Sequence, residues 1–355
     1  MMNSGSMFSP ANYAGIIQVI AEQRPIIEAI EAVNLLGRGG AEGPIAKKWR
    51  TFAKQNADKK YIVANGSEGE SETAKDHELM LRAPWAIIQG MLLASAATGA
   101  KNGIVYVRAE YPECYESMKK AAHDAPLGDF SLEVVHGSGT YVCGEKTAIL
   151  RAIEGKRGEP ALNPAPKAEA GLFGCPVLVN NVESFAAVSQ LLLNGTVTKL
   201  FTVSGCVENP GVYELGYGVT VRELGELAGV KKPVGFRLGG GYTGRIYNTS
   251  SMDMRLDAGA KIGTASVMFF DSSVSVRKLC AESVGILADE SCGKCVPCQY
   301  GTRELYELLS ENGSIEDIRR ICAYLKTNSR CTFGANVPNT VESALVAFPK
   351  EVEHG

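Results

Sequence analysis

Short apolar runs alternate with longer apolar or amphipathic segments between residues 61 and 154. The runs are rich in Val and Ile and too short for helices, so they predict buried strands at residues 61–64, 104–107 and 132–135. The longer segments predict helices at residues 84–98, 112–124 and 144–154. Strands that alternate with helices are typical of an α/β layer with a mostly parallel sheet. Another helix is predicted at residues 180–194, after a long surface loop rich in Gly, Pro and Ala at residues 155–175.

The pattern changes on either side of this region. Residues 13–34 predict one or two amphipathic helices, with Pro25 at a break or in a first turn. Residues 197–207 and 211–214 predict antiparallel strands, and a short helix follows at residues 221–227, which suits a small α+β domain. Helical periodicity then dominates, with helices predicted at residues 276–288, 298–312, 314–327 and 338–348.

Composition and charge narrow the class of protein. The chain has 355 residues, of which 45% are hydrophobic and 21% charged, and this suits two or three packed domains. A net charge of −3 offers no basic footprint for nucleic acid or an anionic membrane surface. The longest apolar stretch, residues 85–100, is too short to span a bilayer. Residues 1–8 lack a secretory signal and the single cysteines are scattered, so we expect a cytoplasmic protein.

Four cysteines form the most specific motif of the chain. Cys292, Cys295 and Cys298 have the spacing C-x2-C-x2-C, and Cys331 follows in a predicted loop before the last helix. Three closely spaced thiolates and one remote thiolate are the usual ligand layout of a [4Fe–4S] cluster. A structural zinc site is the alternative, although zinc more commonly takes two separate C-x2-C pairs. The predicted helices would bring the four sulfurs to one end of a bundle.

Two polar loops are candidates for binding a phosphorylated ligand. The first, residues 37–43, is rich in glycine, which allows backbone N–H groups to approach a phosphate, and Lys48 could add a positive charge. The second, residues 65–72, follows the predicted strand at 61–64, and ligands of open α/β sheets bind at the carboxyl ends of strands. The alternatives are a plain turn for the first loop, with Lys48 solvated beside a core tryptophan, and an acidic solvated loop for the second.

Several segments taken together resemble one family. They run in family order and comprise residues 37–41, 65–76, 141–147, 154–160, 180–183, 204–205 with 210–214, and 291–298 with Cys331. The chain resembles the FMN- and [4Fe–4S]-containing, NADH-oxidising flavoprotein subunit of respiratory complex I. It also resembles the related diaphorase (beta) subunits of NAD(P)-linked hydrogenases, formate dehydrogenases and electron-bifurcating complexes.

This resemblance implies a multidomain α/β fold. After an N-terminal helical segment at residues 1–34, a Rossmann-like FMN- and NAD(P)-binding domain would cover residues 35–195. A small α+β ubiquitin-like domain of the soluble-ligand-binding type would cover residues 196–272. A C-terminal helical bundle with the [4Fe–4S] cluster would cover residues 273–355.

The resemblance also implies the residues of the sites. The flavin contacts of the family fall on Gly37, Gly39, Gly40, Lys48, Asn65, Ser67, Gly144, Glu145, Asn180, Asn181 and Ser184. The nicotinamide nucleotide is expected against Glu70, Tyr141 and Lys146, and Glu70 and Glu145 are the candidates for orienting the reacting rings. The cluster ligands match Cys292, Cys295, Cys298 and Cys331.

Lys146 is the departure from the family with the largest consequence. The family has a second glutamate there, whose carboxylate can bind the adenosine ribose and would repel a 2′-phosphate, whereas a lysine would attract one. A unit charge pair at about 4 Å and an effective dielectric near 20 is worth up to roughly 4 kcal/mol, and about 1.4 kcal/mol is a tenfold change in affinity. We therefore expect NADP(H) to be preferred over NAD(H). The alternative is that Lys146 faces solvent and that other residues set the selectivity.

Other departures also fall in the nucleotide site. Residues 42–44 replace the Gly-Phe-Pro of the family, and residues 163–167 replace its Lys-Pro-Pro-Phe-Pro, so two stacking aromatic rings are missing. Lys167 is a second candidate phosphate contact, and Ser67 replaces the usual aspartate. The flavin site is thus kept, while the nucleotide site is remodelled.

The expected activity is hydride transfer between NADP(H) or NAD(H) and FMN, followed by single-electron transfer through the cluster to partner subunits. The resemblance implies a small thioredoxin-like [2Fe–2S] subunit as one partner. It also implies a further redox subunit, containing flavin or iron–sulfur, in an electron-bifurcating or transhydrogenase-type complex. Two alternatives are an NADH-specific dehydrogenase subunit and a non-catalytic electron-conduit scaffold. Neither nucleic acid nor direct membrane insertion is expected.

Overall fold

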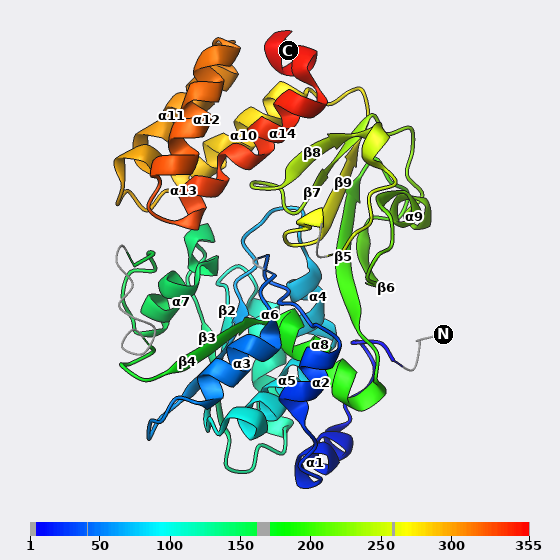
Figure 1. Cartoon of the computed structure of the whole chain (residues 1–355), viewed down its shortest axis with the longest axis vertical. Helices are drawn as coiled ribbons and strands as arrows, with labels where there is room; N and C mark the ends of the chain where they lie inside the picture. The colour runs from blue at the N-terminus through cyan, green and yellow to red at the C-terminus, as the bar shows by residue number, and fades with distance from the viewer. Residues whose placement is uncertain (1–4, 41, 162–170, 258–259, 355) are drawn as a thin grey trace.

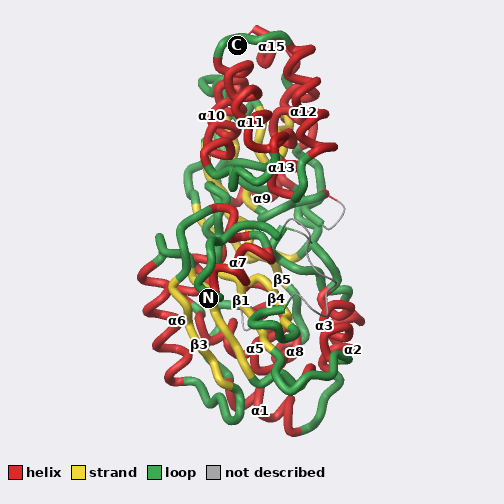
Figure 2. Tube along the Cα trace, turned by 90° about the vertical axis from the view of Figure 1, so that its left-hand side faces the viewer, coloured by secondary structure: helices red, strands yellow, loops and turns green. Residues whose placement is uncertain are grey.

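The computed structural model describes residues 5–40, 42–161, 171–257 and 260–354. In Figure 1 the chain is elongated, with one sheet and the N-terminal helices in the lower half and a second sheet beside the C-terminal helices in the upper half. Figure 2 shows the same division after a turn of 90°, with the C-terminal helices at the end opposite α1 (Tyr13–Ala21). The predicted α/β chain with a parallel sheet and a helical C-terminal region is confirmed.

The first sheet is parallel, with the strand order β3-β2-β1-β4. Its strands are β1 (Tyr61–Gly66), β2 (Asn102–Val107), β3 (Ser131–His136) and β4 (Val177–Asn181). The central β1 pairs Tyr61 with Asn102 on one side and with Val177 on the other. In the same register Asn65 is opposite Asn181, so polar side chains meet at the carboxyl ends of two neighbouring strands.

Strand β4 corrects the prediction of a helix at residues 180–194. The chain first forms β4 and then α8 (Val182–Asn194). A run of five residues carries too little periodicity to distinguish a buried strand from part of a helix. Asn181 ends the strand and begins the helix, because its Oδ1 accepts a hydrogen bond of 3.0 Å from the N–H of Glu183.

Helices cover both faces of the first sheet. Besides α1 and α8 they are α2 (Ile26–Ala32), α3 (Ile45–Ala53), α4 (Lys75–Arg82), α5 (Pro84–Thr98), α6 (Pro112–Asp124) and α7 (Lys146–Ile153), which follows the 3-10 turn η1 (Tyr141–Gly144). Helices α3, α5, α6 and α8 share a core with one face, and α7 packs on the other. Helices α5 and α8 cross closely at Gly90. A Cβ at this position would lie 2.0 Å from the carbonyl oxygen of Phe185, so only a glycine allows the two backbones to approach in this way. The sequence pattern does not predict the short helices α3 and α4. In α4 the buried face includes the charged residues Lys75 and Asp76, so the spacing of apolar residues does not mark a helix.

No single helix among the described residues is long and apolar enough to cross a bilayer. Helices α4 and α5 together have the length and composition, but they are bent by 91° at the break between them. Pro84, the first residue of α5, lies at this break, where a proline is tolerated because the first turn of a helix has no partner for its N–H groups.

The second sheet is mixed, with the strand order β6-β5-β9-β7-β8. Its strands are β5 (Thr198–Gly205), β6 (Gly211–Gly216), β7 (Gly235–Leu238), β8 (Arg245–Asn248) and β9 (Ser266–Phe270), and the 3-10 turn η2 (Thr249–Ser251) follows β8. Strand β5 is antiparallel to β6, as predicted, and parallel to β9. Helix α9 (Val221–Leu227) begins at a capping box between Thr220 and Glu223 and packs Val221 and Leu224 into the core of this sheet.

The chain ends in a helical region with its own hydrophobic core. Its helices are α10 (Val276–Asp289), α11 (Val296–Ser310), α12 (Ile315–Asn328), α13 (Thr332–Asn336), α14 (Pro338–Ala347) and α15 (Pro349–His354). Buried Arg277 of α10 donates hydrogen bonds to the carbonyl oxygens of Leu309, at 2.7 Å, and of Val352. Helix-terminal carbonyls carry partial negative charge, so this guanidinium holds α11 and α15 together. Helix α11 begins two residues earlier than predicted because Pro297 suits a first turn, and Cys298 therefore lies inside the helix.

Candidate functional site

The glycine-rich loop lies against the first turn of α8. The loop contains the predicted flavin residues Gly37, Gly39 and Gly40, and Gly40 has a φ of 86°, which favours glycine. The backbone N–H of Arg38 donates a hydrogen bond of 2.9 Å to Oγ of Ser184, which is buried in α8. Ser184 was predicted as a flavin contact, and in the structure its hydroxyl holds the loop in place.

The two asparagines at the end of β4 have different environments. Nδ2 of Asn181 donates a hydrogen bond of 2.6 Å to Asp76, and a Cβ at Gly39 would lie 3.1 Å from the Cβ of Asn181. The side chain of Asn181 therefore forms hydrogen bonds to other residues of the protein through both its nitrogen and its oxygen. Asn180 is 6% exposed, and its Nδ2 has no hydrogen-bond partner among the described residues. A buried amide without a partner is a donor that a bound ligand can satisfy.

Asn65, at the end of β1, joins the acidic loop to the turn before α7. Its Oδ1 accepts a hydrogen bond of 2.9 Å from the N–H of Ser67, and its Nδ2 donates one of 3.3 Å to the carbonyl oxygen of Gly144. A Cβ at Gly144 would lie 3.6 Å from the carbonyl oxygen of Ser67, which is an ordinary contact. The end of β1, the acidic loop and η1 thus form one continuous wall.

Glu70 is held by residues from two distant segments. Its carboxylate accepts hydrogen bonds from Tyr141 Oη at 2.7 Å, from the N–H of Tyr242 at 2.8 Å and from the hydroxyl of Thr243. Burial, and then the charge of Glu70, raise the pKa of Tyr141 well above its usual value, so the phenol remains a donor. Sequence reasoning missed Tyr242 and Thr243, because no local motif links them to Glu70.

Lys48 and Lys146 act on one another electrostatically. Glu145 caps α7 by accepting a hydrogen bond of 2.8 Å from the N–H of Thr147, and exposed Lys146 is the first residue of that helix. Lys48 is also exposed as a whole, but its ammonium donates to the carbonyl oxygen of Val179 at the end of β4. Burial of this ammonium, and then the Lys146 charge, lower the pKa of Lys48 to about 8. The two positive charges therefore lie on the same side of the site.

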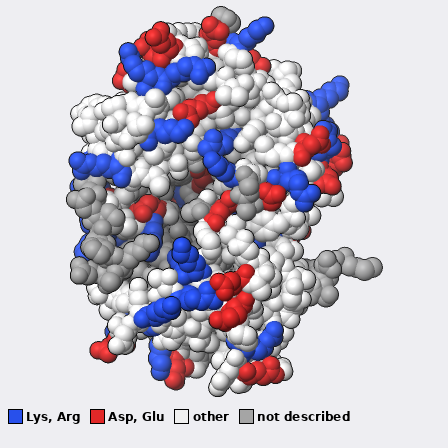
Figure 3. Space-filling view, viewed as in Figure 1, with Lys and Arg blue, Asp and Glu red and all other residues white. Residues whose placement is uncertain are grey.

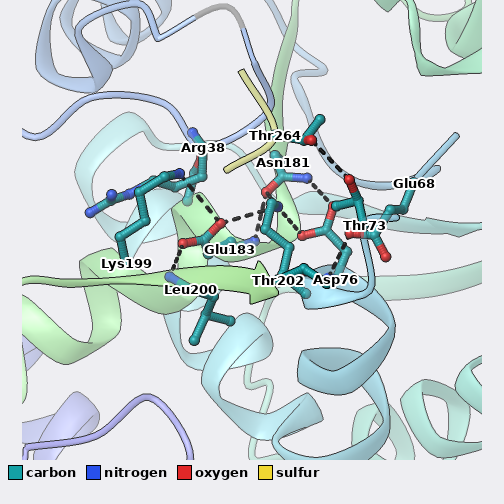
Figure 4. Close-up of polar contacts among 12 residues, drawn as sticks. Arg38, Glu68, Thr73, Asp76, Asn181, Glu183, Lys199, Leu200, Thr202 and Thr264 are labelled. Carbon is teal, nitrogen blue, oxygen red and sulfur yellow. Dashed lines mark hydrogen bonds and ion pairs between the residues drawn. The ribbon is translucent and has the colours of Figure 1, made fainter. Parts of the chain in front are cut away.

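A network of buried charges lies beneath these loops (Figure 4). Nζ of Lys75 is 2.5 Å from Oδ1 of Asp76 and 3.1 Å from Oε2 of Glu183, which is also 3.9 Å from Nζ of Lys199 on β5. Burial opposes ionisation of Glu183, but the Lys199 and Lys75 charges lower its pKa to about 2. Burial lowers the pKa of Lys199 to about 8, while burial and the Asp76 charge raise the pKa of Glu68 to about 8. The network ties α4 and the first turn of α8 to the second sheet.

The four cysteines of the motif gather at one end of the helical region. Cys292 and Cys295 lie between α10 and α11, Cys298 lies in the first turn of α11, and Cys331 is the N-cap residue of α13. A Cβ at Gly334 would lie 3.1 Å from the Cβ of Cys298, so this glycine lets the Cys331 segment approach α11. Burial raises the pKa of Cys298 to about 11, and the thiols of Cys295, Cys331 and Cys292 act in the same direction.

The spacing of these sulfurs suits a cluster better than one zinc ion. Sulfurs bound to one zinc at about 2.3 Å lie roughly 3.8 Å apart. Among the described residues, no three of the four sulfurs lie within 4.8 Å of one another. In a [4Fe–4S] cluster each thiolate binds a different iron atom, which separates the sulfurs more widely.

Apart from Lys167, the predicted flavin and nucleotide residues lie in the described part of the chain and meet at the carboxyl edge of the first sheet. Figure 3 shows that the surface is hollowed between the lower and upper halves of the molecule, and that Lys and Arg side chains border this recess. Lys167, predicted as a second phosphate contact, and Ala41 of the glycine loop lie outside the described residues.

Comparisons with known proteins agree with this arrangement. A family model described as the Nuo51 FMN-binding domain matches residues 30–190, and one described as the NADH-ubiquinone oxidoreductase-F iron-sulfur binding region matches residues 278–355. The chain is 32% identical to an F-type NADH-quinone oxidoreductase subunit of Rhizobium meliloti, over 96% of this chain and 91% of that protein. It is 31% identical to the HndC subunit of the NADP-reducing hydrogenase of Solidesulfovibrio fructosivorans, over 96% of this chain and 78% of that protein.

A solved structure is also similar over nearly the whole chain. It is the crystal structure of an NAD⁺-reducing [NiFe]-hydrogenase in the H₂-reduced state, with a TM-score of 0.89 and 30% sequence identity. The match covers 98% of this chain and 65% of the hydrogenase chain, so this chain spans about two thirds of that longer protein.

Proposed function

Because the chain belongs to the family of F-type NADH-quinone oxidoreductase subunits and hydrogenase diaphorase subunits, we propose that it is an NAD(P)H-oxidising flavoprotein subunit. One observation carries this proposal: the ring centroids of Tyr141 and Phe333 lie 5.6 Å apart. Tyr141 contacts Glu70 in the flavin and nucleotide site, and Phe333 lies two residues after Cys331. The two sites are therefore direct neighbours, as consecutive redox centres need to be.

The residues of the flavin and nucleotide site are suited to binding FMN. The glycine loop offers backbone N–H groups, Lys48 offers a positive charge, and the amide of Asn180, which has no partner in the described part of the chain, offers a buried donor. Asn181 and Ser184 support the flavin site by holding the loop and the start of α8. When bound, FMN would exchange a hydride with the nicotinamide nucleotide and the [4Fe–4S] cluster would carry single electrons. The protein would hold and orient these groups, with Glu70 and Glu145 nearest to the nucleotide.

NADP(H) is the nucleotide that the charges favour. Lys146 places a positive charge where the family carries a glutamate, and a 2′-phosphate would be attracted to it. The effect of this charge on the pKa of Lys48 supports its placement on the side of the site where FMN would bind. One relative is named as a subunit of an NADP-reducing hydrogenase. NAD(H) is the second candidate, because other relatives are named NADH-quinone oxidoreductase subunits.

The domain boundaries and partners belong to the same proposal. We assign a Rossmann-like domain to residues 35–195, a ubiquitin-like domain to 196–272 and a cluster-binding bundle to 273–355, and three separate hydrophobic cores support this division. The N-terminal helical segment, residues 1–34, shares the first of these cores. Relatives that are subunits of larger complexes support redox partner subunits. We expect a small thioredoxin-like [2Fe–2S] protein and a further flavin- or iron–sulfur-containing subunit among them.

The test is a parallel anaerobic titration of the FMN- and iron-replete protein with NADPH and NADH. Flavin absorbance reports the hydride step, and electron paramagnetic resonance of the reduced cluster reports the electron step. Bleaching at a lower concentration of NADPH supports the NADP(H) proposal, and bleaching at a lower concentration of NADH assigns the site to NAD(H). If neither nucleotide bleaches bound flavin, the oxidoreductase proposal is wrong and the chain is an electron-conduit scaffold.

A further inference from the structure

Glu159 forms an ion-pair cluster that reaches into the cysteine loop. Its side chain is largely buried, and its Oε1 lies 3.2 Å from Nη2 of Arg151 and 3.4 Å from Nζ of Lys294. Nε of Arg157 lies 3.8 Å from Oε2 of the same carboxylate. Lys294 stands between Cys292 and Cys295 in the sequence. The α7 side of the flavin and nucleotide site thus has a charged contact with the loop that presents the cysteines.

A second polar contact runs between the same two parts of the molecule. Oε2 of Glu290 accepts a hydrogen bond of 3.0 Å from the backbone N–H of Tyr141, the first residue of η1. Glu290 is the C-cap residue of α10 and precedes Cys292 by two positions. Nη2 of Arg157 also approaches the carbonyl oxygen of Cys292 at 3.5 Å.

Apolar contacts hold η1 in the same place. Val142 is buried within the hydrophobic core of the C-terminal helices, although it belongs to η1. The ring of Tyr141 lies between Phe333 on the cluster side and Tyr242 on the side of the second sheet, with centroids 5.6 Å and 5.8 Å away. Because Glu70 also bonds to the Tyr141 hydroxyl, η1 is fixed from the flavin side and from the cluster side.

The surfaces around these contacts do not close-pack. A hollow of about 600 Å³ separates the end of β3 and the segment after α7 from the cysteine loop, and its lining includes Ser138, Gly158, Asp289 and Cys292. Where packing leaves such a hollow, the separation of the two walls depends on the few contacts that bridge it. Glu290 lines this hollow and bonds to Tyr141. Glu159 follows the lining residue Gly158 and pairs with Lys294 of the cysteine loop, so both contacts join the two walls.

We infer that Glu159, Lys294 and Glu290 are positioning residues that set the separation between the flavin site and the cluster. This inference rests on the proposed function. Solvent and salt screen the ion pairs of a largely buried carboxylate less than they screen surface pairs, so such pairs suit this purpose. Without Lys294, Glu159 keeps its contacts to Arg151 and Arg157, and the link to the cysteine loop is the part that is lost.

The test compares holoenzyme variants by two measurements. Lys294→Met removes the ion pair, Lys294→Arg restores its charge, and Glu290→Ala removes the hydrogen bond to η1. Lys278→Met is the matched control, because it removes one positive charge from the same helical region, where Lys278 pairs with Glu282 on its own helix. Hydrogen–deuterium exchange of residues 138–146 and 289–299, without nucleotide, measures the contact itself. Stopped-flow absorbance and rapid-freeze resonance measure flavin bleaching and cluster reduction separately.

We expect faster exchange in both segments for Lys294→Met and Glu290→Ala, with flavin bleaching unchanged. Cluster reduction should slow on the order of tenfold to 100-fold, since small misplacements of reacting groups have effects of this size. Lys294→Arg and Lys278→Met should match the wild type. Unchanged exchange, or slow cluster reduction that follows a shifted cluster potential, would overturn the inference. Failure of the wild-type flavin to bleach with either nucleotide would instead refute the proposed function.

Discussion

Lys75 and Glu183 form an ion pair of 3.1 Å in which neither side chain is exposed by more than 1%. The pair joins the start of α4 to the first turn of α8, directly below the loops that we assign to the flavin. Buried charges are tolerated only when they are paired, so this arrangement makes the site depend on partners that are distant in the sequence.

Replacing Lys75 by methionine should destabilise the protein by about 3–5 kcal/mol, because it leaves Glu183 and Asp76 buried with a partner missing. Denaturant unfolding of the purified chain measures this loss. Lys101→Met is the control, since its partner Asp129 is 90% exposed and such surface pairs are worth about 0–1 kcal/mol. If the two substitutions lowered the free energy of unfolding equally, the buried pair would contribute no more to stability than a surface pair.

Asn180 and Asn181 should respond differently to alanine. Asn180→Ala should weaken FMN binding by about 0.5–1.5 kcal/mol and leave the flavin-free protein as stable as before, because its amide has no partner to lose among the residues that the structure describes. Asn181→Ala should lower the stability of the flavin-free protein by about 1–3 kcal/mol, because Asp76 and the first turn of α8 lose a partner.

Flavin titration and thermal unfolding of both variants measure these two effects. If Asn180→Ala destabilised the flavin-free protein as much as Asn181→Ala, the assignment of the Asn180 amide to the flavin would be wrong.

FMN affinity should depend on pH through Lys48. The pKa of this ammonium is lowered to about 8 in the flavin-free protein, so it is protonated below that pH and attracts the anionic phosphate. Affinity should be constant between about pH 7 and pH 8, where the FMN phosphate, whose second pKa is about 6, keeps its full charge. It should fall above pH 8 by up to about tenfold per pH unit, as the charge of Lys48 is lost. Fluorescence titration of FMN on both sides of pH 8 checks this. The Lys48→Met variant should bind FMN more weakly and without this pH dependence. If the variant retained the wild-type pH profile, Lys48 would not be the group that controls FMN affinity.

Lys146→Glu should reverse the nucleotide preference. The substitution restores the charge of the family and would repel a 2′-phosphate. Lys146 is exposed, so screening reduces the change to about 1–2 kcal/mol, which is on the order of tenfold in the ratio of the affinities for NADPH and NADH. Steady-state and titration data with both nucleotides measure this ratio. Lys156→Glu, which reverses an exposed lysine paired with Glu154, is the control and should leave the ratio unchanged.

Parts of this structure depend on chemistry that is local in the sequence. The spacing of Cys292, Cys295 and Cys298 specifies a metal centre whatever surrounds it, and the apolar runs at β1 and β2 specify buried strands by composition. Helices α5 and α6 were predicted with their observed bounds, because each begins at a proline and has a clear pattern. Strand β4 and helix α4 were missed, because short runs and buried charges give ambiguous patterns.

The sequence by itself therefore determined the α/β class, the cysteine motif, and the polar residues at the carboxyl ends of the strands. Only the tertiary structure decided how those residues are used. Thr243 bonds to Glu70 across 173 positions, and Lys294 pairs with Glu159. The side-chain amide of Asn181 bonds to Asp76, while Nδ2 of Asn180 has no hydrogen-bond partner among the described residues. The physical reason is that such partnerships depend on how separate elements pack, and packing brings together residues that no local pattern connects.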